Sequence, residues 1–154
     1  MAQKYLVTKD ILKEFDLTEL RLTTTIQLEE YKAARNFFLQ GSATADVYSN
    51  EGNEALKKGD FINVIHFYTR GIKVNCNEKE LEAKLYNNRA IAHFKLGNHQ
   101  DSLRDAEAAI ELNPTYLKAI VRGALACVEL KRFEQAITWC DKGLAVSFEE
   151  MLYF

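Results

Sequence analysis

The chain has 154 residues, of which 47 % are hydrophobic and 27 % are charged, and its formal net charge is −2 at pH 7. These values allow one domain with a sizeable core, and they argue against a general affinity for nucleic acid or anionic membranes. No apolar run approaches the roughly 20 residues that a membrane-spanning helix needs, and the N-terminus lacks a signal-peptide core. We therefore expect a cytoplasmic protein, with the nucleus as an alternative.

Residues 1–44 do not share the pattern that fills the rest of the chain. Leu28, Tyr31 and Phe38 recur at helical spacing, so they form one apolar stripe. This stripe predicts a helix from about Thr25 to Gln40 that packs on the segment after it. The aromatic content is too high for a disordered tail, so we expect an N-terminal helical extension.

Gly41 is a stop signal for this helix, and residues 41–44 are typical of a short linker. The boundary between the extension and the domain that follows it is therefore expected after residue 44. This domain would cover residues 45–154. Its last residues, from Phe148 on, are apolar where a stacked helical array needs a polar cap, which favours a fragment of a longer protein.

Residues 83–116 contain two helical patterns placed back to back. Apolar residues recur at three- and four-residue spacing on both sides of Gly97, and Pro114 ends the second helix because proline cannot continue one. The same skeleton returns over residues 117–150 and, with a longer turn between neighbours, over residues 45–78. A pair of helices this short cannot bury its apolar face alone, so the three copies are expected to stack.

Small residues occupy two fixed places in every copy. They are Gly52, Ala90 and Ala124 at the eighth place, and Gly71, Ala109 and Gly143 at the twenty-seventh. Together with Asn113-Pro114, this pattern resembles the tetratricopeptide repeat family over about two thirds of the chain. The resemblance implies an all-α fold of three helix-turn-helix repeats in a right-handed superhelical solenoid, in which the first helices of the repeats line a concave groove.

The groove is similar to that of the co-chaperone branch of this family, which grips two carboxylates of a peptide in a clamp. The matching residues are Asn53 in repeat one, Asn88 in repeat two, and Lys118 and Arg122 in repeat three. Lys118 and Arg122 stand four residues apart, so both point to one side of a helix. Ser49 stands where the family has its first lysine, so one clamp group is missing.

Other residues of the first helices are also expected to line the groove. They are Lys57, Lys84, Asn87, Ile91 and Lys95. Cations outnumber anions in the predicted groove although the whole chain is acidic, which favours an acidic peptide as partner. Lys57 and Lys84 are candidates to compensate for Ser49.

The resemblance implies a protein–protein adaptor that binds the acidic C-terminal peptide of the heat-shock protein 90 or 70 chaperones. One alternative is a scaffold whose groove is filled by its own N-terminal helix or binds a different partner. A more remote one is a helical-repeat RNA reader, which the net charge and the apolar groove floor disfavour. We find no nucleophile–base pair, phosphate loop or metal-ligand spacing, so we expect no enzyme, cofactor or metal site.

The remaining expectations concern assembly and redox state. We expect a monomer that binds neither nucleic acid nor membrane. Cys76, Cys127 and Cys140 are odd in number and have no Cys-x-x-Cys spacing, so we expect buried, reduced thiols that act as small apolar residues.

Overall fold

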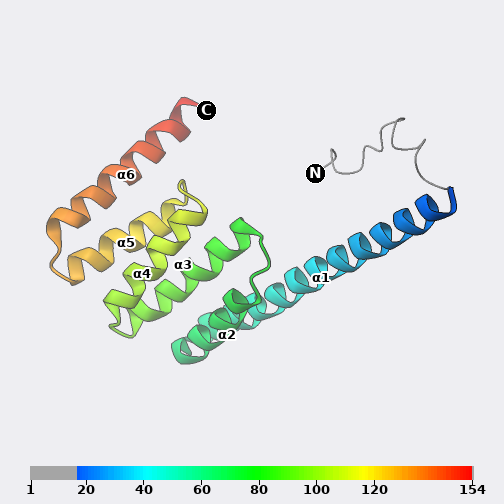
Figure 1. Cartoon of the computed structure of the whole chain (residues 1–154). Helices are drawn as coiled ribbons and strands as arrows, with labels where there is room; N and C mark the ends of the chain where they lie inside the picture. Colours follow the sequence, from blue (N-terminus) through cyan, green and yellow to red (C-terminus); the bar gives the residue numbers. More distant parts are fainter. Residues whose placement is uncertain (1–16, 154) are drawn as a thin grey trace. The chain divides into compact units, whose positions relative to one another are not determined.

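The computed structural model describes the backbone of residues 17–153 and the side chains of residues 25–33, 35–36, 40 and 44–153. Every regular secondary-structure element within residues 17–153 is an α-helix, which confirms the all-α class (Figure 1). The helices are α1 (Leu17–Lys58), α2 (Phe61–Val74), α3 (Lys79–Lys95), α4 (His99–Leu112), α5 (Leu117–Glu129) and α6 (Phe133–Leu152). None of these described helices has the length and apolar character needed to cross a membrane.

The helix α1 runs through Gly41 without a break, so the stop and the linker predicted over residues 41–44 are wrong. A glycine ends a helix when its backbone turns left-handed, as Gly59 and Gly97 do with φ of +73° and +81°. Gly41 stays helical instead. One helical glycine costs only about 1 kcal/mol relative to alanine, and no proline follows to force an end.

The chain divides after residue 39 into two compact units. In the N-terminal unit, the side chains of Leu28 and Tyr31 are 51 % and 57 % exposed. The side chain of Phe38 lies outside the described residues. The packing of this stripe on the first repeat, and the domain boundary after residue 44, therefore stay predictions.

Residues 40–153 form three successive helix pairs that coincide with the three predicted repeats (Figure 1). The last part of α1 pairs with α2 through glycine–side-chain contacts, α3 packs on α4, and α5 packs on α6. Gly59 and Gly97 form the turns inside the first two pairs, and Lys131, with φ of 58°, takes the same left-handed conformation in the third. Contacts between α2 and α3 and between α4 and α5 join the pairs into one stack.

An aromatic ring lies directly on a glycine in the first and third pairs. A Cβ atom added to Gly52 would stand 2.6 Å from Cε1 of Tyr68, and one added to Gly123 would stand 2.6 Å from Cε3 of Trp139. Both rings are buried, Tyr68 completely. The absence of a side chain at these two glycines therefore allows the helices of each pair to approach closely.

A buried polar contact ties α3 to the two helices beside it. The Arg89 Nε and Nη2 atoms donate to the two carboxylate oxygens of Asp105 at 2.7 and 2.6 Å, and Nη1 donates to Thr69 Oγ1 at 3.0 Å. Asp105 is only 5 % exposed. Paired, fork-like hydrogen bonds of this kind satisfy both buried charges, so Arg89 serves the packing of the repeats.

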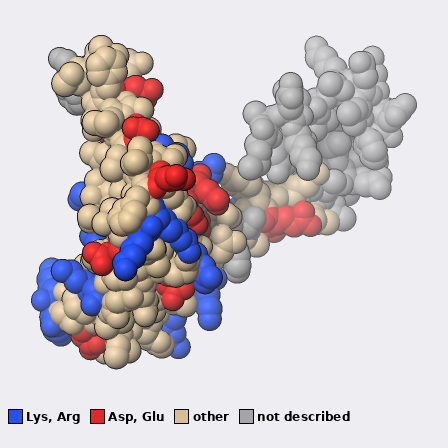
Figure 2. Space-filling view, turned by 90° about the vertical axis from the view of Figure 1, so that its left-hand side faces the viewer, with Lys and Arg blue, Asp and Glu red and all other residues tan. Residues whose placement is uncertain are grey.

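The cysteines differ in burial from the prediction. Cys76 and Cys127 are buried, and burial raises the pKa of both thiols, but Cys140 is exposed. Cys140 lies on the outer face of α6 with Leu144 and Phe148, away from the face that packs on α5. In Figure 2, the surface near the C-terminal end of α6 is mostly uncharged.

The glycine contacts predict opposite effects for two alanine substitutions in the third repeat. Gly123→Ala should lower the free energy of unfolding by about 1–3 kcal/mol, because the new methyl group would overlap the buried ring of Trp139. Gly143→Ala is the control, since its Cβ would lie 3.4 Å from Ile120 Cγ2, an ordinary contact, and alanine favours a helix by about 1 kcal/mol. Urea unfolding measures both. A Gly123→Ala variant as stable as Gly143→Ala would contradict the packing argument.

Candidate functional site

The first helices of the three pairs carry the residues predicted to form the clamp. Asn53 lies on α1, Asn88 on α3, and Lys118 and Arg122 lie one turn apart on α5. The helices α3 and α5 contact each other directly. The guanidinium carbon of Arg122 stands 5.0 Å from the ring centroid of Phe94 on α3, so this arginine spans the boundary between the second and third repeats.

The hydroxyl of Tyr68 joins the two predicted asparagines. It donates to Asn53 Oδ1 at 2.6 Å and accepts from Asn88 Nδ2 at 3.3 Å. The three residues come from α1, α3 and α2, so one buried phenol holds the amides of two repeats together. The sequence analysis did not single out Tyr68, although a buried tyrosine hydroxyl usually requires a polar partner.

Lys118 and Arg122, the basic pair on α5, form no ion pair within the described part of the chain. Lys118 is exposed, and no carboxylate in the described part of the chain pairs with it. Arg122 is partly buried, and its Nε is enclosed without a hydrogen-bond acceptor among the described atoms. Burial lowers the pKa of Arg122 because the surroundings stabilise its charge less well than water does. The charge of Arg122 is therefore left without an anionic partner among the described residues.

An apolar strip on α5 accompanies the basic pair. Val121, Leu125 and Val128 recur at helical spacing and are 50 %, 43 % and 45 % exposed. Large apolar side chains left open beside cations are typical of a surface that binds a peptide with both charged and apolar groups. Ile91 on α3 is partly buried.

The other predicted groove residues are placed unequally. Lys84 and Lys95 are exposed, Ser49 is partly buried, and Lys57 is held by Glu54 at 2.7 Å. Asn87 is only 2 % exposed and donates to the Tyr116 hydroxyl at 3.4 Å. Its expected place on the groove surface is therefore wrong, because Asn87 is buried beside Tyr116, which lies in the turn between α4 and α5.

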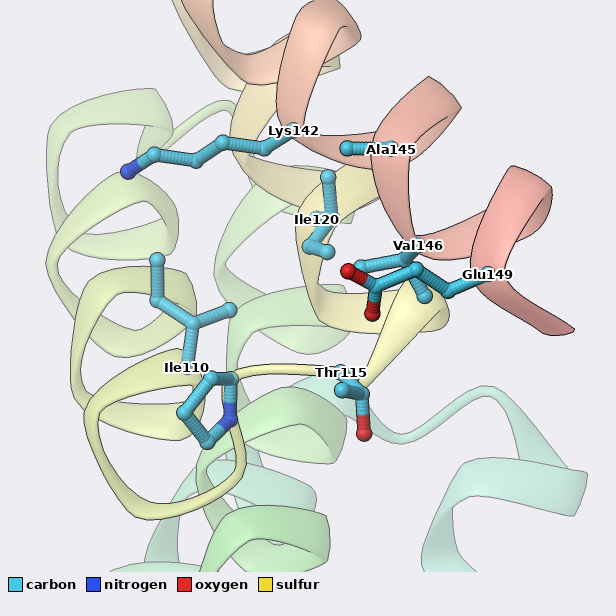
Figure 3. A pocket seen from close by; sticks show the side chains of 8 residues that line it. Ile110, Thr115, Ile120, Lys142, Ala145, Val146 and Glu149 are labelled. Carbon is cyan, nitrogen blue, oxygen red and sulfur yellow. The ribbon is translucent and has the colours of Figure 1, made fainter.

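A separate depression of about 440 Å³ lies between the end of α4 and α6 (Figure 3). Its walls are mostly apolar, and Lys142 and Glu149 contribute its charged groups. None of the predicted clamp residues lines it. Among the described residues, no group of three or more His, Cys, Asp or Glu side chains is arranged to hold a metal ion.

The burial of Tyr68 predicts a pH effect on stability. Burial raises the pKa of its phenol, so as pH rises above about 10 the unfolded chain loses this proton first and the folded state becomes less favoured. Tyr68→Phe should therefore lose less unfolding free energy than the parent between about pH 9 and pH 11. Tyr153→Phe is the control, because it removes the phenol of a tyrosine that is 89 % exposed. Equal slopes for parent and Tyr68→Phe would contradict the assignment.

Comparison with known proteins gives a consistent result. The tetratricopeptide repeat family pattern matches residues 83–116, the segment identified as the second repeat. The human protein named Tetratricopeptide repeat protein 4 is 45 % identical over 106 residues, which cover 69 % of this chain and 27 % of that protein. The chain thus spans about a quarter of the length of these curated relatives.

Solved structures agree in fold. The TPR2B domain of yeast Sti1 in its pHsp70 complex has a TM-score of 0.65 and 30 % identity, covering 70 % of this chain and 83 % of that one. The first TPR of Spaghetti (RPAP3), bound to the HSP90 peptide SRMEEVD, has a TM-score of 0.62 and 30 % identity, covering 68 % and 82 %. Repeat pattern, helix pairing and sequence identity lead to one conclusion: this chain belongs to the tetratricopeptide repeat family.

Proposed function

We propose that this chain is a co-chaperone-type adaptor that binds the acidic C-terminal peptide of a heat-shock protein 90 or 70 chaperone. The observation that carries the proposal is Arg122, a partly buried cation of α5 that no carboxylate in the described part of the chain pairs with. Two similar structures are described as complexes with pHsp70 and with the HSP90 peptide SRMEEVD, which supports an acidic peptide as the ligand.

The cations and the amides of the site would each make different contacts with such a peptide. Arg122 offers a planar fork that can hold a carboxylate with two hydrogen bonds, and Lys118 adds a mobile charge one turn away. Asn53 and Asn88 can donate amide hydrogens without adding charge. The exposed Val121, Leu125 and Val128 would contact apolar side chains upstream in the peptide.

The proposal includes binding without catalysis, because the site combines cations, amides and apolar side chains but no nucleophile beside a general base. It also includes a cytoplasmic or nuclear location, in which the three free cysteines would stay reduced.

The basic pair gives the central test. Arg122→Ala should weaken binding of the free-acid peptide MEEVD by at least about tenfold, because a charge-assisted hydrogen bond is worth roughly 1.5–3 kcal/mol. Arg104→Ala is the matched control: it removes the same charge from an exposed arginine of α4 that pairs with Asp101, outside the candidate site. Isothermal titration calorimetry measures both. The C-terminally amidated peptide should bind weakly to every variant, since it lacks the terminal carboxylate.

Unchanged affinity in Arg122→Ala would show that the guanidinium does not hold the peptide. A scaffold with a self-filled groove would then explain the chain better. A parent chain that binds neither form of the peptide would reject the proposed ligand itself.

Ser49 predicts a gain of function. Serine lacks the charge of the lysine that the family has at this place, which should cost about ten- to a hundredfold in affinity. Ser49→Lys should recover part of this affinity, and the gain should shrink as salt screens the new charge. Ser49→Gln is the control, because it lengthens the side chain without charge. Equal affinity for Ser49→Lys and Ser49→Gln at low salt would contradict this role.

A further inference from the structure

Two tyrosine hydroxyls lie against neighbouring asparagines of α3. The Tyr68 hydroxyl accepts from Asn88 at 3.3 Å, and the Tyr116 hydroxyl accepts from Asn87 at 3.4 Å. Only the first also donates, within the described hydrogen bonds, to a second asparagine, Asn53, at 2.6 Å. Tyr68 therefore connects both amides of the proposed clamp, whereas Tyr116 contacts an amide outside it.

The direction of these hydrogen bonds fixes how each amide is turned. A phenol has a single proton, and Tyr68 gives it to Asn53 Oδ1, so the carbonyl of that amide is held inward. The amide nitrogen of Asn53, with both of its hydrogens, makes no hydrogen bond to Tyr68. Asn88 uses one amide hydrogen on the phenol oxygen and keeps a second. Each amide thus retains N–H groups that can donate to a carboxylate. If the amide were flipped, its carbonyl oxygen would face the carboxylate and repel it.

We infer that Tyr68 is a positioning residue for the proposed clamp, which it serves by turning the amide donors of Asn53 and Asn88 toward a bound carboxylate. The inference rests on the proposed function and deepens it. Tyr68 itself needs no contact with the ligand. Its effect comes from the orientation of two side chains that belong to different repeats.

The phenol is well placed for this task because it cannot easily move. Tyr68 is completely buried, and its ring lies so close to Gly52 that a Cβ there would stand 2.6 Å from Cε1. Burial also raises the pKa of the phenol, so it keeps the proton that it donates to Asn53 near neutral pH. The packing of the first repeat therefore sets the hydrogen-bond pattern of the site.

Removal of one oxygen atom tests the inference. Tyr68→Phe keeps the ring on Gly52 and should weaken binding of the free-acid MEEVD peptide about three- to tenfold, as expected for a neutral hydrogen-bond network. Tyr116→Phe is the matched control: it removes a partly buried hydroxyl bonded to an asparagine of the same helix and should leave affinity unchanged. Thermal unfolding of both variants checks that the fold is kept.

A double-mutant cycle separates positioning from a general loss of stability. Asn53→Ala removes one amide, and once it is gone Tyr68→Phe should cost distinctly less affinity than in the parent. Full additivity of the two losses would overturn the inference, because a hydroxyl that acts partly through Asn53 must lose that part of its effect when Asn53 is absent. Unchanged affinity in Tyr68→Phe would overturn it too, while a loss in Arg122→Ala in the same series would leave the proposed function standing.

Nuclear magnetic resonance gives a readout that needs no ligand. The side-chain amide signals of Asn53 and Asn88 should shift and show faster local motion in Tyr68→Phe, and those of Asn87 should respond in Tyr116→Phe instead. Amide signals of Asn53 and Asn88 that stay as in the parent would show that the phenol does not hold these side chains, and this result would also overturn the inference.

Discussion

The close contact between a ring and a glycine is the constraint on which the first repeat depends. Tyr68 can reach the interior beside α1 because Gly52 has no side chain there. The same arrangement recurs with Trp139 on Gly123 in the third repeat. Only the tyrosine has a hydroxyl, and the depth of its ring brings this hydroxyl between two asparagines of different helices. A packing requirement thereby determines the polar geometry of the candidate site.

Two arginines show how a packing cation differs from a binding cation. Arg89 and Arg122 are both partly buried, and desolvation opposes the charge of each. Arg89 has Asp105 at hydrogen-bond distance, and the pKa of its guanidinium is raised in spite of burial. Arg122 has the face of Phe94 but no carboxylate partner in the described part of the chain, so its pKa is lowered. Its charge is therefore available to pair with an anionic ligand, as the proposed function requires.

The repeats could be predicted from the sequence because they depend on local signals. Gly59, Gly97 and Pro114 mark turns and ends through backbone conformations that only certain residues favour. The same rule failed at Gly41, where helical neighbours on both sides outweigh the small cost of one glycine. Periodicity also misplaced Asn87, because it gives the face of a helix but not whether a residue of a following turn, here Tyr116, covers that face.

The hydrogen bonds of Tyr68 with Asn53 and Asn88 could not be predicted from sequence patterns. Tyr68 lies 15 residues from Asn53 and 20 from Asn88, on a helix that does not belong to the row lining the groove. Such a bond depends on the rotation and spacing of three helices, which follow from packing. Periodicity can predict which residues share a helix face. The partner to which the Tyr68 hydroxyl donates can be identified only from the assembled fold.

Ser49 changes the balance between charge and geometry in this site. With a lysine at that place, repeats one and three would both bring cations to the ligand. Here the cations at the clamp positions come from α5 alone, and α1 and α3 contribute neutral amides. A neutral donor binds a carboxylate well only at short range and correct angle, whereas a charge also acts at a distance. Without the lysine, binding of a carboxylate would depend less on electrostatic attraction and more on the orientation of the Asn53 and Asn88 amides. It would therefore also depend on the buried Tyr68 that holds these amides.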